Sequence, residues 1–382
     1  MEEKFLYKKI YKYIVDEITS GNLKSGDKIL TEFEIMDKFG VSRVTATKAL
    51  SALAADEYII RKRRSGSFVA ENPPSPLKKR IKVLYKENIR QIALVTPFSS
   101  TWGGTNAFSL LLQSAFENKI AINVFISRYD LETEREILTT LLNSEVQAVI
   151  CIPIVSSKNI DCFEALRTKG IPVLFIDWTL PFSNIPLVSF THMLSFKKLT
   201  EWLIDNGFSE LAFCFNSEVI TSECEMFRGF LSALSERGLF LNPNNLIRLG
   251  NSYNTGGNEV DDIKAGIIRE RLKEYLKNGN LPEVILCAND PTARMVIEEA
   301  SDLGIKIPEE LSVTGFEDNS SIANVLKSSV QLTTVHQDFA QFAKTIIDTL
   351  LLLLQGKEIT KPILCDTHLV IRDSVKLKEK RN

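Results

Sequence analysis

Two pairs of polar side chains in the last third of the chain stand where a ligand site could form. Asn289-Asp290 follows the apolar run 284–287, and Glu317-Asp318 follows the run 311–316. If both runs are parallel strands, the pairs emerge at their carboxyl ends, where open α/β sheets bind ligands. Amide and carboxylate groups hydrogen-bond hydroxyl-rich molecules. The pattern therefore predicts that Asn289 and Glu317 contact a small polar ligand.

Aromatic and polar side chains between residues 98 and 178 extend this predicted site. They follow the first and fourth apolar runs of the region that begins at residue 92. Aromatic rings stack on the C–H faces of sugars or on bases, and amide or carboxylate groups bond hydroxyl groups. Ordinary packing is the alternative role, above all for the tryptophans. The predicted contacts are Phe98, Trp102, Asn106, Asp177 and Trp178.

A different chemistry is indicated near the N-terminus, in the run 40–50. Its sequence, Gly-Val-Ser-Arg-Val-Thr-Ala-Thr-Lys-Ala-Leu, reads as a turn that opens into a helix. Small polar and cationic side chains in the first turn of such a helix reach phosphates and base edges when the helix enters the DNA major groove. The residues predicted to be available for this contact are Ser42, Arg43, Thr45, Thr47 and Lys48.

The charge distribution supports a phosphate-binding N-terminal part. The 382 residues carry a formal net charge of −2, but residues 1–90 hold 19 Lys and Arg against 12 Asp and Glu, a net charge of +7. The remainder carries −9. A basic end on an acidic body suits nucleic-acid binding by that end, and a solvated basic surface is the alternative.

Catalytic and metal chemistries find little support. The three histidines, His192, His336 and His368, have no nucleophile or carboxylate partner at a recognisable spacing. Neither a G-x-S-x-G motif nor a phosphate-binding glycine loop is present. The six cysteines lack metal or redox spacing and are expected to be buried reduced thiols. We therefore predict a protein that is not an enzyme, with no catalytic residues, no metal and no cofactor.

The sequence contains no signal for the membrane. The N-terminus has no apolar signal-peptide core, and the aliphatic run 350–354 is too short to cross a bilayer. We therefore expect a cytoplasmic protein without a membrane partner.

The first 70 residues predict three helices and a hairpin. Ile10, Ile14 and Ile18 recur at helical spacing in the first helix, and Thr31 with Glu34 forms a capping-box pattern before the second. The third helix is expected to begin at Ser42 and to bury Val44, Leu50 and Leu53. Two short strands around a basic turn at 61–64 complete the pattern of a winged helix-turn-helix.

Composition divides the chain into three parts. Residues 71–90 contain Pro-Pro-Ser-Pro and then Lys-Lys-Arg, which favours an extended linker. The predicted organisation is a DNA-binding domain at 1–70, a linker at 71–90, and a two-lobed domain for effector binding and dimerisation at 91–382.

Beyond residue 91, apolar strands alternate with amphipathic helices, which predicts parallel sheets covered by helices. Asp290 is expected to cap the helix that begins at Pro291. Ligands of such sheets bind at the strand carboxyl ends, here between two α/β lobes. The expected strands are 92–96, 122–126, 146–152, 173–176, 210–215, 284–287 and 311–316, and the expected helices are 107–118, 132–143, 159–168, 194–206, 223–237, 260–278 and 291–303.

Residues 6–70 resemble the GntR-type winged helix. The ordered matches are the turn 21–30, the run 40–43, Thr45, Ala49-Leu50 and the run 66–69. The resemblance implies operator binding as a dimer, with the third helix in the major groove and the wing, whose backbone approaches at Gly66, in the minor groove. The full predicted DNA-contacting set is Thr31, Ser42, Arg43, Thr45, Thr47, Lys48, Arg63 and Gly66. Phe33 and Thr47 depart from the family pattern, which commonly has a polar or Arg residue at the first position and Arg at the second.

Residues 91–375 resemble the LacI-type effector domain, which is similar to periplasmic sugar-binding proteins. The matches are the runs 287–290, 304–318 and 332–337. The resemblance implies that Asn289 and Glu317 hydrogen-bond the ligand, with Glu317 in place of the usual Asp. Met226 occupies the position of the family's ligand-binding Arg, and Arg228, just before Gly229-Phe230, is the substitute candidate.

The combination of these two parts resembles the arabinose repressor subgroup. It implies a dimeric, ligand-responsive transcription repressor that a sugar or sugar-derived effector releases from operator DNA. The sequence leaves open a ligand-activated activator, and also a sugar-binding protein or enzyme without a DNA role. The surfaces near 107–118 and 258–278 are the predicted dimer contacts.

Overall fold

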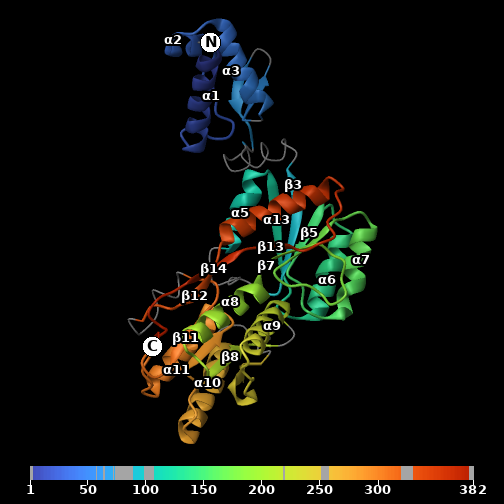
Figure 1. Cartoon of the computed structure of the whole chain (residues 1–382). Helices are drawn as coiled ribbons and strands as arrows, with labels where there is room; N and C mark the ends of the chain where they lie inside the picture. Colours follow the sequence, from blue (N-terminus) through green and yellow to red (C-terminus); the bar gives the residue numbers. More distant parts are fainter. Residues whose placement is uncertain are drawn as a thin grey trace. The chain divides into compact units, whose positions relative to one another are not determined.

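The computed structural model describes residues 3–56, 58–62, 65–71, 73, 89–98, 107–217, 220–250, 258–319 and 330–377 (Figure 1). The chain forms two compact units, Met1–Ile89 and Arg90–Asn382. Three predicted site residues, Arg63, Trp102 and Asn106, and most of the predicted linker 71–90 lie outside the described residues. Within the described ranges, no helix is long and apolar enough to span a membrane.

The N-terminal unit is a winged helix-turn-helix, as the sequence predicts. Three helices, α1 (Glu3–Thr19), α2 (Glu32–Phe39) and α3 (Arg43–Ala55), precede the antiparallel hairpin β1 (Ile59–Lys62) and β2 (Gly66–Val69). Ile10, Ile14 and Ile18 of α1 are buried in one core with apolar residues of the other elements. Helical spacing of these isoleucines therefore directs α1 onto α3 and the hairpin.

Local capping fixes where α2 begins and ends. Thr31 accepts a hydrogen bond from the Glu34 backbone N–H at 3.3 Å, and Glu34 accepts one from the Thr31 backbone N–H at 2.7 Å. This reciprocal pair is the predicted capping box. Gly40 ends the helix at φ 61°, a left-handed conformation that glycine adopts without steric cost.

The phase of α3 differs from the prediction at two neighbouring residues. Val44 is 73% exposed, whereas Thr45, predicted to be available for contact, is buried at 5% exposure. The buried stripe contains Ala46, Ala49 and Leu50. Each residue turns the helix by about 100°, so Val44 lies about 200° away from Ala46. Packing of the small residues on α1 therefore places Val44 on the outer face and Thr45 inside.

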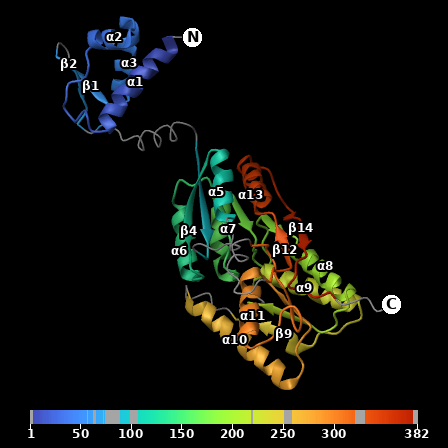
Figure 2. The ribbon, with the colours of Figure 1, turned by 90° about the vertical axis from the view of Figure 1, so that its left-hand side faces the viewer.

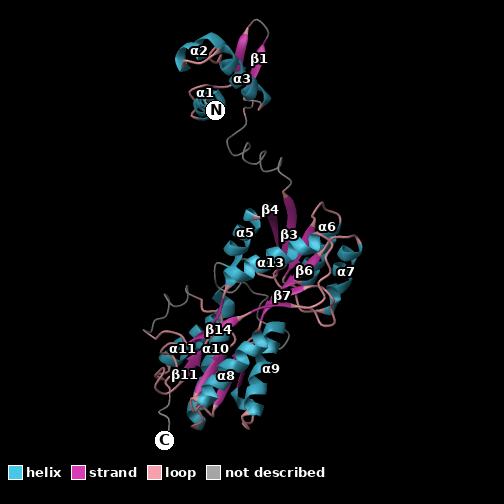
Figure 3. Ribbon diagram, turned by 45° about the horizontal axis from the view of Figure 1, so that its top comes forward, coloured by secondary structure: helices cyan, strands magenta, loops and turns pink. Residues whose placement is uncertain are grey.

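The first lobe of the C-terminal unit contains a six-stranded, fully parallel sheet in the order β13-β7-β6-β5-β3-β4. Helices α5 and α13 cover one face, and α6 and α7 cover the other (Figure 3). The strands are β3 (Arg90–Thr96), β4 (Ile120–Ile126), β5 (Ala148–Cys151), β6 (Val173–Ile176), β7 (Leu187–Phe190) and β13 (Ile363–Cys365), and the helices are α5 (Ala107–Glu117), α6 (Leu131–Leu142), α7 (Ile160–Thr168), preceded by the 3-10 turn η2 (Ser157–Asn159), and α13 (Phe339–Leu354).

Side-chain alternation along the strands explains this sandwich. Ile92 and Leu94 of β3 pack towards α5 and α13, and Ala93 and Val95 pack towards α6 and α7. Successive side chains of a strand point to opposite faces, so a continuous apolar run needs helices on both sides.

The second lobe, with α8, α9, α10 and α11 labelled in Figure 2, repeats this arrangement. Its parallel sheet has the order β11-β10-β8-β9. Helices α8 and α9 share one core with the sheet, and α10 and α11 share the other. The strands are β8 (Leu211–Phe215), β9 (Leu246–Arg248), preceded by the 3-10 turn η3 (Pro243–Asn245), β10 (Val284–Cys287) and β11 (Ser312–Thr314), and the helices are α8 (His192–Asp205), α9 (Thr221–Glu236), α10 (Asn258–Asn278) and α11 (Asp290–Asp302).

Three connections join the lobes: β7 to α8, β12 (Thr334–Gln337) to α13, and β13 to β14 (Thr367–Val370). Strands β12 and β14 pair antiparallel. The sequence prediction contains neither α13 nor the strands β7, β9, β12, β13 and β14, because most of these segments are short and α13 has an apolar run without a clear boundary. The predicted fold class is nevertheless confirmed.

The cysteines agree only in part with the expectation. All six are free thiols, and Cys151, Cys214, Cys287 and Cys365 are buried. Cys162 and Cys224 are half-buried, because they lie on helix faces rather than in sheet strands.

Candidate functional site

Polar side chains follow the carboxyl ends of strands in both sheets of the C-terminal unit. Asp177 follows β6 of the first lobe, whereas Asn216, Asp290 and Glu317 follow β8, β10 and β11 of the second. Glu317 interacts electrostatically with Asp177, Asp290 and Glu223, the last of which lies in the first turn of α9. The two lobes thus meet at a group of four carboxylates, Asp177, Glu223, Asp290 and Glu317, which we call the acidic cluster.

Asp177 adopts an uncommon backbone conformation at the end of β6. Its φ is 64°, and its backbone N–H donates to Val188 O at 2.9 Å while its carbonyl accepts from Ser189 Oγ at 3.0 Å. These two hydrogen bonds to β7 therefore hold Asp177 in a conformation that is sterically unfavourable for a residue with a Cβ. Such strain is frequent where a side chain is aimed at a ligand.

His192 is a member of the site that the sequence analysis missed. Its Nε2 lies 3.5 Å from Asp177 Oδ1, and the ring stacks on Phe316 with centroids 5.8 Å apart. Burial lowers the pKa of His192 to about 4, so the ring is neutral at physiological pH. The signal was its place two residues after the largely apolar run 187–190, which was not recognised as a strand.

The helix cap at the start of α11 differs from the prediction. Asn289, not Asp290, caps α11: its Oδ1 accepts the Thr292 backbone N–H at 2.9 Å. Asp290 is buried and accepts from Thr334 Oγ1 at 2.7 Å and from the Asn319 backbone N–H at 2.6 Å. The prediction was wrong because Pro291 follows the first helical residue here rather than the cap. Asn289 stays a predicted ligand contact.

Asp290 holds a carboxylate in an environment that disfavours its charge. Burial raises its pKa to about 6 even though the hydrogen bonds from Thr334 and Asn319 oppose the shift. A Cβ on Gly315 would stand 2.1 Å from Asp290 Oδ1. Only glycine at position 315 therefore allows β11 to pass this close to the carboxylate.

Glu317 presents an unsatisfied acceptor. Its backbone has φ 114°, and its N–H donates to Val335 O at 2.8 Å. In the part of the chain that the structure describes, its buried Oε2 accepts no hydrogen bond. Burial, and then Asp290, Asp177 and Glu223, raise its pKa well above the ordinary range. A buried acceptor without a partner costs free energy, which a donor on a ligand would recover.

Glu223 organises the loop after β8. Its Oε2 accepts the backbone N–H groups of Asn216 and Ser217 at 2.9 and 2.8 Å, and its Oε1 accepts Asn216 Nδ2 at 2.7 Å. Burial raises the pKa of Glu223 against these bonds and against the charge of Lys264. Asn216 Oδ1 is buried and accepts no hydrogen bond from the described residues.

Three aromatic rings lie at the first-lobe side. Phe98, Tyr129 and Trp178 have pairwise centroid distances of 6.0 to 6.3 Å. Trp178 is 8% exposed and belongs to the first-lobe core, which is the packing role that the sequence analysis left open. Burial, and then Glu223, raise the pKa of Tyr129, so this aromatic group borders the acidic cluster.

Arg228 lies apart from this group. Its guanidinium pairs with Glu225 at 2.7 Å on the surface of α9, with 68% of the side chain exposed. Met226, at the position where the resemblance places a ligand-binding arginine, is buried in the second-lobe core. The geometry therefore gives no support to Arg228 as a ligand contact. Among the described residues, no group of three His, Cys, Asp or Glu side chains could hold a metal ion.

The winged head contains a second candidate site, centred on Glu32 at the start of α2. Its carboxylate pairs with Arg43 at 3.3 Å and with Arg61 of β1 at 2.8 Å. Burial would raise the pKa of Glu32, but hydrogen bonds from Arg43, Arg61 and Thr47 outweigh it and lower the pKa. One carboxylate therefore pairs with guanidinium groups from α3 and from β1.

The other predicted DNA contacts divide by exposure. Lys48 is exposed, with its Nζ 5.0 Å from the Tyr7 ring centroid, and Gly66 opens β2 at φ 111°. Ser42 caps α3 through the Thr45 backbone N–H at 3.3 Å, which leaves Thr45 inside.

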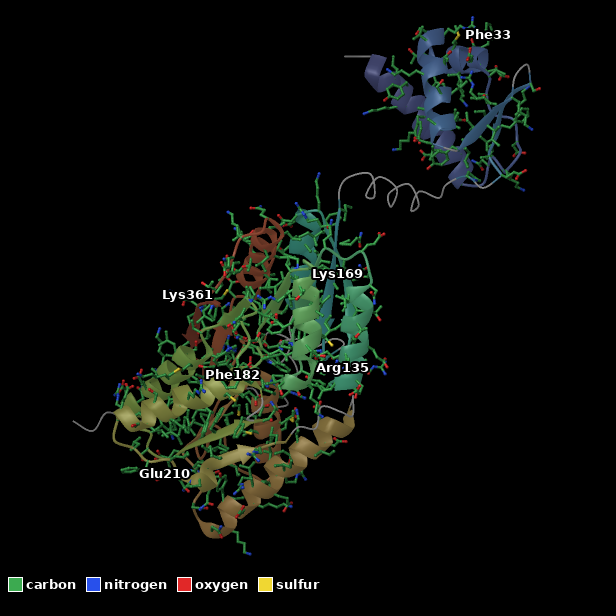
Figure 4. All side chains as sticks on the ribbon, turned by 90° about the vertical axis from the view of Figure 1, so that its right-hand side faces the viewer. Phe33, Arg135, Lys169, Phe182, Glu210 and Lys361 are labelled. Carbon is green, nitrogen blue, oxygen red and sulfur yellow. The ribbon has the colours of Figure 1, made fainter. Side chains whose placement is uncertain are left out.

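Two apolar side chains that were not among the predicted contacts lie on the outside of the head. Phe33 of α2 is 77% exposed, and its side chain projects from the head in Figure 4. Val44 of α3 is 73% exposed.

A winged helix-turn-helix unit, followed by two parallel α/β lobes that meet at polar strand ends, defines a DNA-binding module joined to a periplasmic-binding-protein-like domain. Residues 6–69 match the gntR family of bacterial regulatory proteins. Residues 200–375 match the periplasmic binding protein-like domain. The chain thus carries a gntR-family domain followed by a domain of that type.

Two curated relatives align with most of this chain. The arabinose metabolism transcriptional repressor of Halalkalibacterium halodurans is 27% identical over 343 residues, which cover 88% of this chain and 85% of the relative. A protein of the same name from Geobacillus stearothermophilus is 23% identical over 98% of this chain and all of the relative.

Solved structures show the fold. The transcription regulator CcpA of Lactococcus lactis superposes with a TM-score of 0.62 at 19% identity and covers 76% of this chain and all of its own. The lac repressor dimer bound to operator and an anti-inducer gives 0.65 at 20% identity, with coverage of 80% and 99%.

Proposed function

We propose that this protein is a ligand-responsive transcription regulator: a homodimeric repressor that leaves its operator when a sugar or sugar-derived effector binds at the acidic cluster. The observation that carries the proposal is the presence, in one chain, of a winged head with ordered cations and of unsatisfied acceptors where two α/β lobes meet. The names of the curated relatives agree with it. Such a protein works on chromosomal DNA, and we therefore place it in the cytoplasm.

The DNA-contacting surface combines charge with apolar contact. Arg43, held by Glu32, suits bidentate recognition of a guanine, and the exposed Val44 beside it suits contact with a thymine methyl group. Lys48, together with Arg63 and Gly66 of the wing, suits the phosphate backbone. Phe33 adds an apolar surface where the resemblance leads one to expect a polar side chain.

The effector must bind one arrangement of the lobes better than the other, because equal affinity shifts no equilibrium. Glu317 and Asn289 from the second lobe, with Asp177 and Phe98 from the first, are the proposed contacts. A ligand that bonds residues of both lobes favours their closed arrangement. That closure is the proposed signal to the winged heads.

The test uses the full chain. DNA that the protein retains from a random pool gives the operator, and a thermal-shift screen of pentoses, hexoses and sugar acids gives the effector. Arg43→Ala is expected to lower operator affinity by about 5- to 150-fold, the value of a bidentate base contact of about 1–3 kcal/mol. Glu317→Ala is expected to abolish the effector response while operator affinity stays unchanged.

Arg167→Ala is the matched control, since Arg167 is a surface residue of α7 that pairs with Glu164. An effector that strengthens operator binding would make the protein an activator. Failure to enrich any DNA sequence, or loss of operator affinity in the Glu317 variant alone, would contradict the proposal.

A further inference from the structure

The balance of charge and of hydrogen-bond capacity at the acidic cluster says what kind of ligand fits. This inference rests on the proposed function, because it takes the acidic cluster as the effector site. Among the described residues, the charge of Lys264 acts on Glu223 of the acidic cluster, and Asp318, a further carboxylate that acts on Asp290, is already paired with Arg372 at 2.6 Å.

The unsatisfied groups at the site are acceptors. Glu317 Oε2 and Asn216 Oδ1 are both buried, and neither accepts a hydrogen bond from the described residues. Asn216 is 4% exposed, and its Nδ2 already donates to Glu223, so its carbonyl oxygen is the free end of the amide. A ligand that satisfies both atoms must supply donors.

The remaining neighbours add no positive charge. Asp290 is bonded by a threonine hydroxyl and a backbone N–H, both neutral donors. His192, beside Asp177, is buried at 4% exposure and stays neutral. Met226 stands where the resemblance places a ligand-binding arginine, and the Arg228 side chain is exposed and paired with Glu225. A phosphate or carboxylate group would therefore meet a cluster of carboxylates in which Lys264 already acts on Glu223.

The aromatic group supplies the complementary surface. Tyr129 lies near Glu223, and its ring packs with those of Phe98 and Trp178. Aromatic faces attract cations and also stack on sugar C–H groups. Carboxylates next to aromatic rings are a chemistry suited to a protonated amine.

We propose that the effector carries a protonated amine next to hydroxyl groups, as an amino sugar does, and that Glu317 is the partner of the ammonium group. The surroundings of Glu317 disfavour its ionised form, and an ammonium ion is the donor that also supplies the missing counter-charge and so stabilises the carboxylate. A neutral hydroxyl can satisfy the hydrogen bond but supplies no counter-charge, and an anion would add a further negative charge beside the carboxylates.

Isothermal titration calorimetry on the full-length protein, without DNA, tests this with matched ligand pairs. The pairs are glucosamine with glucose and galactosamine with galactose, at a pH where the amines are protonated. N-acetylglucosamine, glucose 6-phosphate and gluconate complete the panel. We expect the amine of at least one pair to bind at least tenfold more tightly than its neutral parent, N-acetylation to remove the gain, and both anions to bind more weakly than glucose.

Glu317→Gln keeps the shape of the side chain and removes its charge. We expect this variant to lose the preference for the amine by about tenfold and to bind the neutral sugars within about twofold of the parent protein. Glu225→Gln, which neutralises an exposed carboxylate of α9 outside the acidic cluster, should leave the preference intact. Unchanged operator binding shows that the variants fold.

Equal or tighter binding of the neutral sugars or anions, no gain for either amine, or an undiminished preference in Glu317→Gln would overturn the inference. Different outcomes would contradict the regulatory proposal. An amine that binds without altering operator affinity leaves the ligand class standing and removes the regulatory role. A neutral sugar that binds best and releases the operator supports the regulatory role and contradicts the proposed ligand class.

Discussion

At the scale of single residues, the acidic cluster contains side chains and backbone conformations that lower the free energy of unfolding. Asp290 and Glu317 are ionisable groups in surroundings that favour their neutral forms. Asp177 and Glu317 also occupy left-handed backbone conformations that cost free energy for residues other than glycine. These costs persist because neighbouring strands fix the backbone of both residues. Together they mark the strand ends as a place that evolved for something other than folding.

The raised pKa of Asp290 gives a stability prediction with a defined sign. Between its ordinary value of 3.8 and about 6, the folded protein binds a proton that the unfolded chain has released. This contribution to the free energy of unfolding is complete below pH 3.8 and is lost as the pH rises through about 6. The shift corresponds to about 3 kcal/mol.

Asp290→Asn should therefore remove this pH dependence. Chemical denaturation across this pH interval is expected to show the stability difference between the parent protein and the variant shrinking as the pH rises, on top of a constant cost for the weakened bonds to Thr334 and Asn319. A difference that is constant or grows with pH would show that Asp290 is ionised in the folded protein at low pH.

At the scale of elements, the start of α11 both caps the helix and positions a side chain of the acidic cluster. Asn289 closes the helix with its Oδ1, and the next residue is the buried Asp290. A helix whose first backbone N–H groups are capped begins at a fixed residue, and this fixes the direction of its first side chains. The cap thereby positions Asp290 against Gly315 of the strand-end turn.

A capping role and a ligand role for Asn289 can be separated by two substitutions. Asn289→Ala is expected to lower the free energy of unfolding by about 1 kcal/mol, and Asn289→Ser to restore it, since serine also caps. If Asn289 contacts the effector, the serine variant will be stable but will bind the effector more weakly. Denaturation and calorimetry measure the two effects. A stable alanine variant would contradict the capping role.

At the scale of the whole molecule, regulation requires that subunits associate. Apolar side chains are exposed in both regions that the sequence analysis proposed as dimer contacts. Phe116 of α5 is 70% exposed with Leu112 nearby on the same helix, and Ile263 of α10 is 50% exposed. Two such faces on one chain are what a two-fold dimer of two-lobed subunits would bury.

Phe116→Glu is expected to weaken self-association by at least tenfold, because it places a charge in a buried apolar contact. Sedimentation at several protein concentrations measures the dimer, and operator binding should become more dependent on protein concentration. Phe240→Glu is the control, since Phe240 is 95% exposed and lies outside both regions. An unchanged dimer in the Phe116 variant, or an equal loss in the control, would reject α5 as the interface.

Local chemistry in the sequence was enough to predict much of this protein. The capping box at Thr31, the cap at Ser42, the isoleucine spacing of α1 and the apolar runs of the sheets depend on residues a few positions apart. Such interactions are the same in any context. They placed the winged head, the alternating strands and helices, and the strand ends from which Glu317 and Asp177 emerge.

Only the tertiary structure decided which side chains meet and which way they face. Asp177 acts on Glu317, which lies 140 positions later in the sequence, and His192 lies beside a carboxylate that no sequence spacing indicates. The phase of α3 is set by packing on α1, which buried Thr45 and exposed Val44. Such contacts depend on how whole elements pack, and packing sums many weak, non-local interactions that no short stretch of sequence contains.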